Sequence, residues 1–298
     1  MTRDMNETDG SVVVIGEALI DVVEQATASV EHVGGSPTNV ALGLGRLGVP
    51  VSLLTYLARD RRGQSVSQHL EASGVRVLDV SFSAQRTSTA VARIGNDGAA
   101  DYTFDLEWDV SGDQIEESPT LVHTGSIGAF LQPGASTVLR HLQNTPAMEV
   151  SFDPNIRSAL VGSRDEALGC FEAITKVATV VKMSDEDAEW LFPGASVDDV
   201  LDQVLARGPR LVAVTRGGDG AVLSTGAHRV PLPAAKTDVV DTIGAGDTFM
   251  ASLISSVVAS GSHSLTSDDL ERMGAKAIRA AALTVSRAGA DLPWSHEL

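Results

Sequence analysis

The sequence has very few cysteines and few basic residues. Cys170 is the single cysteine among 298 residues, so neither an intrachain disulfide nor a thiolate cluster can form, and a reducing compartment fits. Lys and Arg number 22 against 39 Asp and Glu, which gives a net charge of −17. Nucleic-acid surfaces and contacts with anionic membranes require basic patches, so the composition argues against both kinds of partner.

Long apolar runs are absent as well. No stretch approaches the roughly 20 residues that a helix needs to span a bilayer. The first residues, MTRDMNETDG, are polar and acidic and lack the apolar core of a secretory signal. We therefore expect a cytoplasmic protein, whose length and 43% hydrophobic content suffice for a sizeable core.

Short β-branched runs alternate with helix-compatible segments along the chain. Segments such as TNVALGLGRLG (38–48) and ASTVLRHLQNT (135–145) have helical spacing. This alternation predicts an α/β fold with a largely parallel sheet that helices cover on both faces, and ligands then bind beyond the carboxyl ends of the strands. The clearest strand-like runs are SVVVIGEALIDVV (11–23), VSLLTYLA (51–58), TLVHTGS (120–126), MEVSFDP (148–154), ATVVKMS (178–184) and RLVAVTRG (210–217).

One region departs from this rhythm. TSTAVARIGNDGAADYTFDLEW (87–108) reads as a strand, an Asn-Asp-Gly turn and a second strand, which is typical of a β-hairpin. In an α/β chain such a hairpin is either an extra edge pair or a flap over a site. The residues alone leave both interpretations open.

A glycine-rich segment, VVDTIGAGDTFM (239–250), joins a strand-like run to a helix. The first amides of a helix lack internal partners and lie at its positive end. The small residues Gly244, Ala245 and Gly246 would let an anion approach these amides, and Asp247 could accept a proton from a hydroxyl beside it. An ordinary helix cap explains the same residues equally well.

A second glycine string, GLGRLG (43–48), matches the spacing of a dinucleotide fingerprint. That fingerprint needs a strand-to-helix turn, whereas this string lies inside and at the end of a helix that starts near Thr38. We therefore interpret it as helix packing and a glycine stop, without NAD.

Two long segments carry a family resemblance. VVDTIGAGDTFMASL (239–253) is similar to the second signature of the ribokinase-like carbohydrate kinases, the PfkB family, and VGGSPTNVALGLGRLG (33–48) resembles the first. SFDPNIR (151–157), VVKMSDEDAEWLFPG (180–194) and VTRGGDGAVL (214–223) extend the resemblance over essentially the whole chain. GEALID, FDPN, VKMS and VTRG look most like bacterial fructokinase-type members.

The resemblance implies a fold. It is a ribokinase-like three-layer α/β/α architecture in a single domain over 1–298, with a mostly parallel central sheet. A small β-sheet lid would be formed by residues 87–108, with a contribution from about 22–34. In many relatives this lid pairs with that of a second subunit, which implies a homodimer.

The resemblance also assigns roles to residues. Asp247 would be the general base, with Gly244, Ala245 and Gly246 as the anion hole. Asp21, which we expect at the end of the first strand, would bind sugar hydroxyls. The other sugar-binding positions would be Gly34, Gly35, Asn39, Phe104 and Arg157, the last accompanied by Asp153 and Asn155 in SFDPNIR.

ATP and Mg²⁺ are the implied cofactors. The nucleotide contacts would be Lys182, Ser184, Thr215, Arg216, Gly217 and Gly220. Asp187 stands where the wider family often has a longer Glu, so we expect it to reach Mg²⁺ through water. Asp241 matches a position that helps bind a monovalent cation in some relatives. K⁺ is therefore a further cofactor that the resemblance allows but does not require. As bare patterns, SDEDAE is also an N-capped helix start and VTRGGDG a turn.

The implied activity is transfer of the γ-phosphoryl of Mg-ATP to a hydroxyl of a neutral sugar, fructose first. Acidic lid residues Asp105, Glu107 and Asp109 would repel an acid sugar such as 2-keto-3-deoxygluconate. A ribokinase, a 2-keto-3-deoxygluconate kinase or a nucleoside kinase of the same family remains an alternative. So does a regulator that binds a sugar or nucleotide without catalysis.

Overall fold

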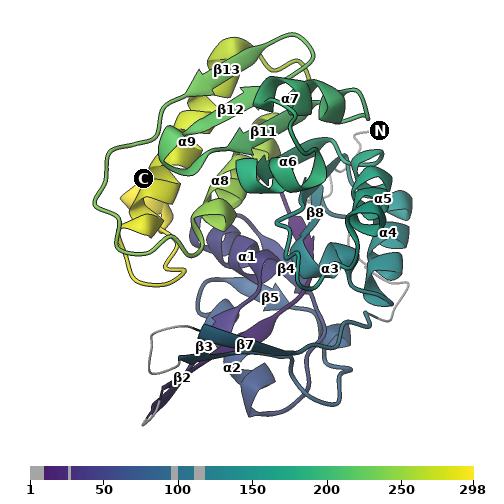
Figure 1. The fold of residues 1–298 in the computed structure, drawn as a ribbon, viewed down its shortest axis with the longest axis vertical. Helices are drawn as coiled ribbons and strands as arrows, with labels where there is room; N and C mark the ends of the chain where they lie inside the picture. Colours follow the sequence, from purple (N-terminus) through teal and green to yellow (C-terminus); the bar gives the residue numbers. More distant parts are fainter. Residues whose placement is uncertain (1–9, 26–27, 95–99, 111–117) are drawn as a thin grey trace, which may run out of the picture.

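The main feature of the fold is a nine-stranded sheet (Figure 1). The computed structural model describes residues 10–25, 28–94, 100–110 and 118–298. The strands of the main sheet are β1 (Val12–Ile15), β4 (Val51–Leu54), β5 (Val75–Val77), β8 (Leu121–Gly125), β9 (Glu149–Asp153), β10 (Val180–Ser184), β11 (Leu211–Thr215), β12 (Ala221–Ser224) and β13 (Arg229–Leu232). Their order is β13-β12-β11-β10-β9-β8-β1-β4-β5. All neighbours are parallel except β11 with β12 and β12 with β13, which confirms the predicted sheet.

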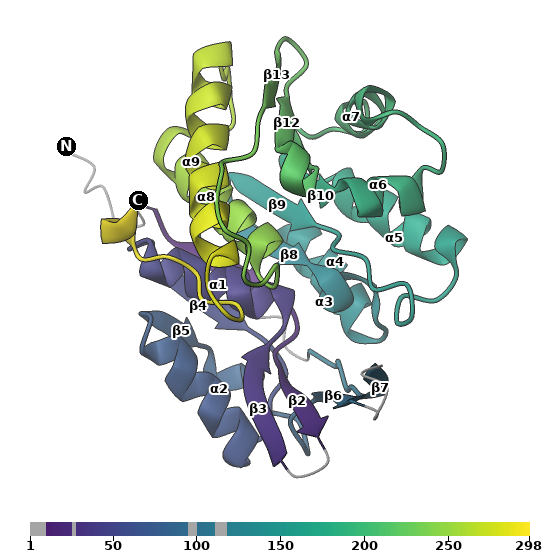
Figure 2. The same cartoon turned by 60° about the vertical axis from the view of Figure 1, so that its left-hand side comes forward.

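Helices cover both faces of this sheet (Figure 2). One face carries α1 (Ser36–Arg46), α2 (Arg61–Glu71), α8 (Ala245–Ser260) and α9 (Ser267–Val285). The other carries α4 (Gly134–Asn144), α5 (Arg164–Thr175), α6 (Asp185–Leu191) and α7 (Val197–Leu205). Short helices are α3 (Ser126–Phe130) and three 3₁₀ turns at Asp79–Ser81, Gly217–Asp219 and Ser295–Glu297.

The strands are apolar throughout because both of their faces are buried. In β1, Val12 and Val14 join the core beneath α1 and α8, while Val13 and Ile15 join the core beneath α4 and α5. Successive side chains of a strand point to opposite faces, so a doubly covered strand reads as a continuous apolar run. Within the described residues, no helix combines the length and apolarity that crossing a membrane requires.

A separate four-stranded sheet lies at one end of the molecule (Figure 1). Its strands are β2 (Leu19–Gln25), β3 (Ala28–Gly34), β6 (Thr89–Ile94) and β7 (Ala100–Asp105), in the order β3-β2-β6-β7. Antiparallel pairing of β6 with β7 confirms the predicted hairpin, whose Asn-Asp-Gly turn at 96–98 lies outside the described residues. The N-terminal contribution begins at Leu19, earlier than the expected 22–34.

The run SVVVIGEALIDVV is not one strand. It divides into β1 of the main sheet and β2 of the small sheet, and Asp21 therefore lies within β2 instead of ending the first strand. Hydrophobicity hides the break because Ile20 and Val22 of β2 are buried in the same core as Val12 and Val14 of β1. Only the change of hydrogen-bonding partners, from Leu54 to Gly34, marks it.

Two other local predictions need correction. Residues 237–243 form no strand, because Val239, Val240 and Ile243 are exposed and the amides of Val240 and Asp241 both bond the carbonyl of Val285. Helix α1 starts at Ser36, before the expected Thr38, since a proline fits the first turn of a helix.

Candidate active site

The predicted catalytic and nucleotide residues meet where the carboxyl ends of the parallel strands face the start of α8. Gly244 caps this helix in the left-handed conformation, with φ of 79°. A side chain there would also lie 2.9 Å from the Cβ of Ala290, so glycine is required twice over. The amide of Ala245 bonds the carbonyl of Thr242, which leaves the amides of Gly246 and Asp247 for an outside acceptor.

The carboxylate of Asp247 is buried and held at both oxygens. Oδ1 accepts a hydrogen bond from the hydroxyl of Ser36 at 2.6 Å, and Oδ2 accepts one from the side-chain amide of Asn39 at 2.8 Å. Both donors lie in the first turn of α1, so the two signature segments meet at this carboxylate. The family resemblance assigns Asn39 to the sugar, and here its amide holds the carboxylate of Asp247. Ser36 is not among the residues predicted from the sequence, although a hydroxyl directly after two glycines at a helix start is a usable signal.

A buried ion pair lies beneath the start of α8. Nζ of Lys182 is 2.9 Å from Oδ2 of Asp153, and both side chains are almost fully buried. The same Nζ is 2.9 Å from the position that a Cβ on Gly246 would occupy. Lys182 therefore places a positive charge directly under the start of α8, where a phosphoryl group would bind.

Burial and neighbouring charges shift the titration of this ion pair. Burial raises the pKa of Asp153 to about 7, with Asp187 and Asp247 adding to the shift and Lys182 opposing it. For Lys182, burial favours the neutral amine, but the surrounding carboxylates of Asp153, Asp187 and Asp247 outweigh it and raise the pKa. Oδ1 of Asp153 has no hydrogen-bond partner among the described residues. It is thus available to a cation or a water.

Ser184 and Asp187 form the N-terminal cap of α6. Asp187 Oδ2 accepts the amide of Ser184 at 3.0 Å, and the hydroxyl of Ser184 accepts the amide of Asp187. Oδ1 of Asp187 accepts the amide of Ile156 at 2.7 Å. Both oxygens are engaged, so direct metal coordination would cost a backbone bond. No group of three or more metal-binding side chains occurs among the described residues.

These residues fit Mg²⁺ bound together with ATP. Mg²⁺ keeps several of its waters and is commonly held by one or two carboxylates and the phosphates of the substrate. Asp153 offers a free oxygen, and Asp187 can be reached through water. The chain supplies no cage of its own for the metal in the part that the structure describes.

The sugar-binding candidates gather around the base of the small sheet. A Cβ on Gly34 would lie only 2.0 Å from Oδ2 of Asp21, so the carboxylate of Asp21 rests directly on that glycine. Burial raises the pKa of Asp21, and the charges of His32 and Arg157 oppose the shift. The strand register, Asp21 to Ala90 and Ala90 to Phe104, places Phe104 on the same face of the sheet as Asp21.

Two of the three acidic residues that were expected to repel an acid sugar, Asp105 and Glu107, do not act as free charges. Arg86 forms a two-pronged pair with Asp105, at 2.9 and 2.8 Å, and a further ion pair with Glu107 at 2.9 Å. Asp105 follows Phe104 in β7 and therefore faces the other side of the sheet. The structure thus removes most of the basis for expecting an acid sugar to be repelled.

The loop after β11, where nucleotide contacts are predicted, contains glycines of two kinds. Gly217 has φ of 49°, and a Cβ added to it would have nothing within 4 Å, so space is open there. Gly220 has φ of 87°, and its Cβ would lie 2.0 Å from the carbonyl oxygen of Leu232. The hydroxyl of Thr215 donates to Met183 at 3.4 Å, and the guanidinium of Arg216 donates to the carbonyl of Asp219 at 2.9 Å. Backbone packing alone explains Gly220.

Asp241 connects the loop before α8 with the C-terminal segment. Its carboxylate accepts the amide of Ile243 at 3.0 Å and that of Gly289 at 2.8 Å. These two bonds lower the pKa of Asp241 and keep it charged. The residue after Gly289 is the Ala290 that packs on Gly244, so this carboxylate supports the turn of the anion hole.

Glu17 is a buried residue near the site that the sequence analysis does not single out. Its Oε2 accepts the amide of Gly128 at 2.8 Å, and the Ser126 side chain also bonds it. Burial raises the pKa of Glu17 to about 7, against these hydrogen bonds and the charge of Arg157. In the sequence, the only indication of this role is that Glu17 is a charged residue inside the strand-like run 11–23.

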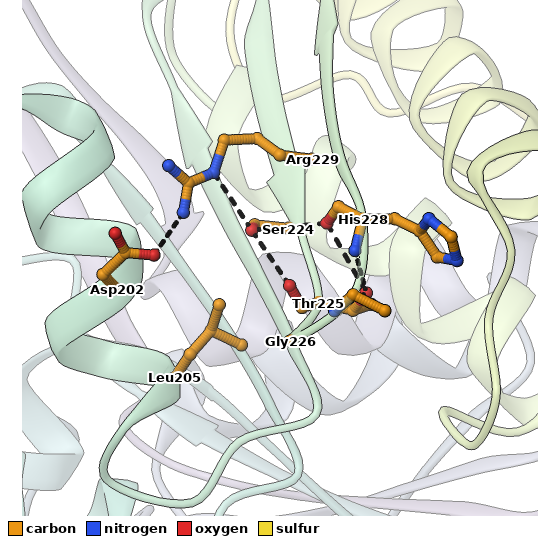
Figure 3. Close-up of a pocket in the computed structure, with 8 residues that line it drawn as sticks. Asp202, Leu205, Ser224, Thr225, Gly226, His228 and Arg229 are labelled. Atoms are coloured by element: carbon orange, nitrogen blue, oxygen red, sulfur yellow. Dashed lines mark hydrogen bonds and ion pairs between the residues drawn. The ribbon is translucent and has the colours of Figure 1, made fainter.

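A pocket of about 320 Å³ lies elsewhere, at the turn between β12 and β13 (Figure 3). The register of Val212 with Ser224 places this turn at the amino ends of the parallel strands, on the edge opposite the catalytic residues. Arg229 in the pocket pairs with Asp198 and Asp202. Its charge is already neutralised, so this pocket is not an anion site. The lining residues are Asp202, Leu205, Ser224, Thr225, Gly226, Ala227, His228 and Arg229.

Known proteins resemble the chain along its length. The family model described as pfkB family carbohydrate kinase matches residues 9–297. A fructokinase of Rhizobium leguminosarum bv. trifolii is 32% identical over 256 residues, which cover 81% of this chain and 78% of that protein.

Two solved structures share the fold. The aminoimidazole riboside kinase of Salmonella enterica, complexed with aminoimidazole riboside and an ATP analogue, matches with a TM-score of 0.81 and 25% identity, covering 96% of this chain and 98% of that one. A double-mutant fructokinase of Vibrio cholerae O395, with fructose, ADP and a potassium ion bound, matches with a TM-score of 0.79 and 25% identity, covering 95% of this chain and 94% of that one.

The two glycines of the nucleotide loop should respond differently to alanine. Gly220→Ala should lower the melting temperature by several degrees or prevent folding, because its Cβ meets a backbone carbonyl. Gly217→Ala should cost only about 1–2 kcal/mol for its left-handed backbone but weaken ATP binding. Thermal unfolding and ATP titration of both variants check this. Equal melting temperatures for the two variants would contradict the packing explanation.

Glu17 should make folding stability depend on pH. Its pKa is raised from 4.5 to about 7, so its stabilising contribution is complete below pH 4.5 and is lost as the pH rises to about 7. Between pH 4.5 and about 7, the free energy of unfolding should fall less in Glu17→Gln than in the parent chain, with a difference of about 3 kcal/mol. Urea unfolding at a series of pH values measures this difference. Part of the slope should remain because Asp153 titrates in the same direction.

Glu166→Gln provides a control of opposite sign. Hydrogen bonds from Ser163 lower the pKa of Glu166, so its contribution is present above pH 4.5 and is lost as the pH falls. The variant should therefore be destabilised at pH 7 and match the parent chain in acid. If Glu17→Gln and Glu166→Gln shift the pH profile in the same direction, the assignment for Glu17 is wrong.

Proposed function

The chain belongs to the PfkB family of carbohydrate kinases, which are ATP-dependent phosphotransferases, and from that premise we propose that it phosphorylates fructose with Asp247 as the general base. The observation that carries the proposal is the fixed carboxylate of Asp247 beside the free amides at the start of α8. The fructokinase relative and the fructose-bound neighbour support fructose as the acceptor.

The base acts from a fixed position. Ser36 and Asn39 hold the two oxygens of Asp247, so its carboxylate does not need to reorient when a sugar hydroxyl arrives. The hydroxyl proton would pass to Asp247 as the oxygen attacks the γ-phosphorus of ATP, and the bond between the γ-phosphorus and the β-phosphate would break to release ADP. General bases of this kind typically contribute 10²–10⁴-fold in rate.

The developing charge on the transferred phosphoryl group would be met by three donors. These are the amides of Gly246 and Asp247 and the ammonium of Lys182, which is already fixed by Asp153. Because they are positioned before the reaction, they stabilise the transition state without reorganisation. Bound with ATP, Mg²⁺ would offset the charge of the β- and γ-phosphates.

The four-stranded sheet is proposed as a lid over the sugar. Asp21 and Phe104 share one face, and Asp21 lies against Gly34 at the entrance to α1. A sugar on that face would be enclosed between the sheet and the anion hole. Exclusion of water would then limit hydrolysis of ATP.

Asp241 is proposed to support a potassium site. Its carboxylate organises the loop before α8 and the segment at Gly289, and carbonyl groups of these loops are the ligands that such an ion prefers. The Vibrio neighbour binds a potassium ion, which supports the proposal. A K⁺ held there would reinforce the turn at Gly244.

The first experiment is ADP release with Mg-ATP over a panel of acceptors, in KCl and in NaCl. The panel holds fructose, ribose, 2-keto-3-deoxygluconate, aminoimidazole riboside and adenosine. Fructose should give the highest kcat/KM, and Asp247→Asn should lower kcat by about 10²–10⁴-fold. Asp268→Asn, an exposed acid at the start of α9, is the control and should retain full activity.

The outcomes separate the parts of the proposal. Turnover of another acceptor far above that of fructose would overturn the substrate and leave the kinase in place. Asp247→Asn at more than a tenth of the parent rate would overturn the base. Equal rates in KCl and NaCl would overturn the potassium site.

The lid is also proposed to join two subunits. Val30 of β3 is 49% exposed and lies on the face that carries Asp21 and Phe104, since Val23 pairs with Val30 and Asp21 with His32. Phe104 is 39% exposed on that face. An apolar surface of this kind is suited to pairing with the same surface of a second copy.

Val30→Lys should therefore dissociate the protein. Light scattering should give twice the chain mass of 31.0 kDa for the parent and the single mass for the variant. Val80→Lys is the matched control, because Val80 is 48% exposed and lies outside the small sheet. A parent chain that is monomeric at micromolar concentration, or a Val80→Lys variant that dissociates equally, would refute pairing through the lid.

A further inference from the structure

Glu17 lies between the small sheet and the catalytic carboxylate without belonging to either. It lies two residues after the end of β1, and its side chain is buried. Its carboxylate accepts the amide of Gly128 at 2.8 Å and is bonded by the Ser126 side chain. Both partners belong to α3, which follows β8 at the same edge of the main sheet. Glu17 thus fixes the start of α3.

The other end of this connection is the exit of the small sheet. Trp108 lies three residues beyond the end of β7 at Asp105, and its indole nitrogen donates to the carbonyl of Gly128 at 2.9 Å. Trp108 is buried, and a Cβ on Gly134 would lie 2.4 Å from its ring. The ring therefore cannot shift without moving α3 or α4. Gly128 is bonded on one side by Glu17 and on the other by the end of the hairpin.

The backbone of Glu17 contacts the helix that orients Asp247. Its carbonyl accepts the hydroxyl of Thr38 at 2.9 Å, and a Cβ on Gly35 would lie 2.5 Å from the same oxygen. Gly35 precedes the turn of α1 that supplies Ser36 and Asn39 to Asp247, and Thr38 lies within that turn. A displacement of Glu17 would therefore reach the general base within two contacts.

We propose that Glu17 is a positioning residue that couples the attachment of the lid, through Trp108 and α3, to the turn of α1 that orients Asp247. The proposal rests on the proposed sugar kinase activity of this site. Coupling of this kind needs an element with two arrangements, and here that element is the lid with and without a sugar. When the lid becomes ordered on the sugar, these contacts would hold the first turn of α1, and with it the carboxylate of Asp247, in one position.

Three variants test the coupling in steady-state kinetics. Glu17→Ala removes the acceptor for Gly128, whereas Glu17→Gln retains one. Trp108→Phe removes the indole donor and part of the buried ring but keeps an aromatic side chain. Glu17→Ala should raise the KM for fructose about tenfold and lower kcat several-fold, with the KM for ATP within about twofold. Glu17→Gln should keep both constants near the parent values, because its side-chain oxygen still accepts the amide of Gly128.

The double variant distinguishes coupling from independent damage. If Glu17 and Trp108 act through the same residue, Gly128, the combined loss should be smaller than the sum of the two single losses. Losses that simply add would overturn the proposal. Glu149→Gln is the control, because Glu149 is also a buried carboxylate but bonds Ser262 at the opposite end of β9. It should leave the KM for fructose unchanged.

Amide hydrogen exchange tests the same connection without a substrate. In Glu17→Ala and in Trp108→Phe, exchange should accelerate about tenfold or more across residues 100–110 and 126–130, and Glu149→Gln should leave both segments at the parent rate. Unchanged exchange in α3 would overturn the proposal. If the parent chain fails to phosphorylate fructose, the acceptor is wrong, and exchange in these variants still decides the coupling. If Glu17→Ala does not fold, Trp108→Phe gives the same decision.

Discussion

The site depends on one contact, the pairing of the Asp247 carboxylate with the first turn of α1. Ser36 and Asn39 lie 211 and 208 residues from Asp247 along the chain, and each donates to one of its oxygens. A buried carboxylate without such partners would be costly, so α1 and α8 must start at the same place. Because α1 follows β2 and β3 of the small sheet and α8 begins at Gly244, this contact also brings the two proposed substrate sites together.

The charges around this contact would favour a cationic partner at the site. The carboxylates of Asp153, Asp187 and Asp247 all act on Lys182, which is the one ammonium among them. Burial makes the imbalance expensive, as the raised pKa of Asp153 shows. A divalent cation arriving with ATP would compensate that excess. The same ammonium lies under the anion hole, so a single lysine offsets the carboxylates and attracts phosphate.

Much of this architecture could be predicted from the sequence, because parallel strands and helix starts have local signatures. The sheet, the hairpin and the capping role of Ser184 were confirmed. The predictions that were wrong or missing concern residues whose roles depend on contacts with residues far away in the sequence. The split of the first strand is invisible because both halves enter one core. Ser36 and Glu17 acquire their importance only when α1, α3 and α8 meet, and Asp105 loses its charge effect only when Arg86 folds against it.

The same contacts explain how the small sheet, the proposed lid, is inserted in the chain. The hairpin of β2 and β3 leaves the main sheet after Glu17 and returns at Gly35, and the contact between these two residues closes that insertion at its base. The hairpin of β6 and β7 returns through Trp108, whose bond to Gly128 leads back to Glu17. Both halves of the small sheet therefore connect to Glu17, the β2–β3 half through its backbone carbonyl and the β6–β7 half through its carboxylate. A change at this one buried residue would reach both halves and the first turn of α1 at once.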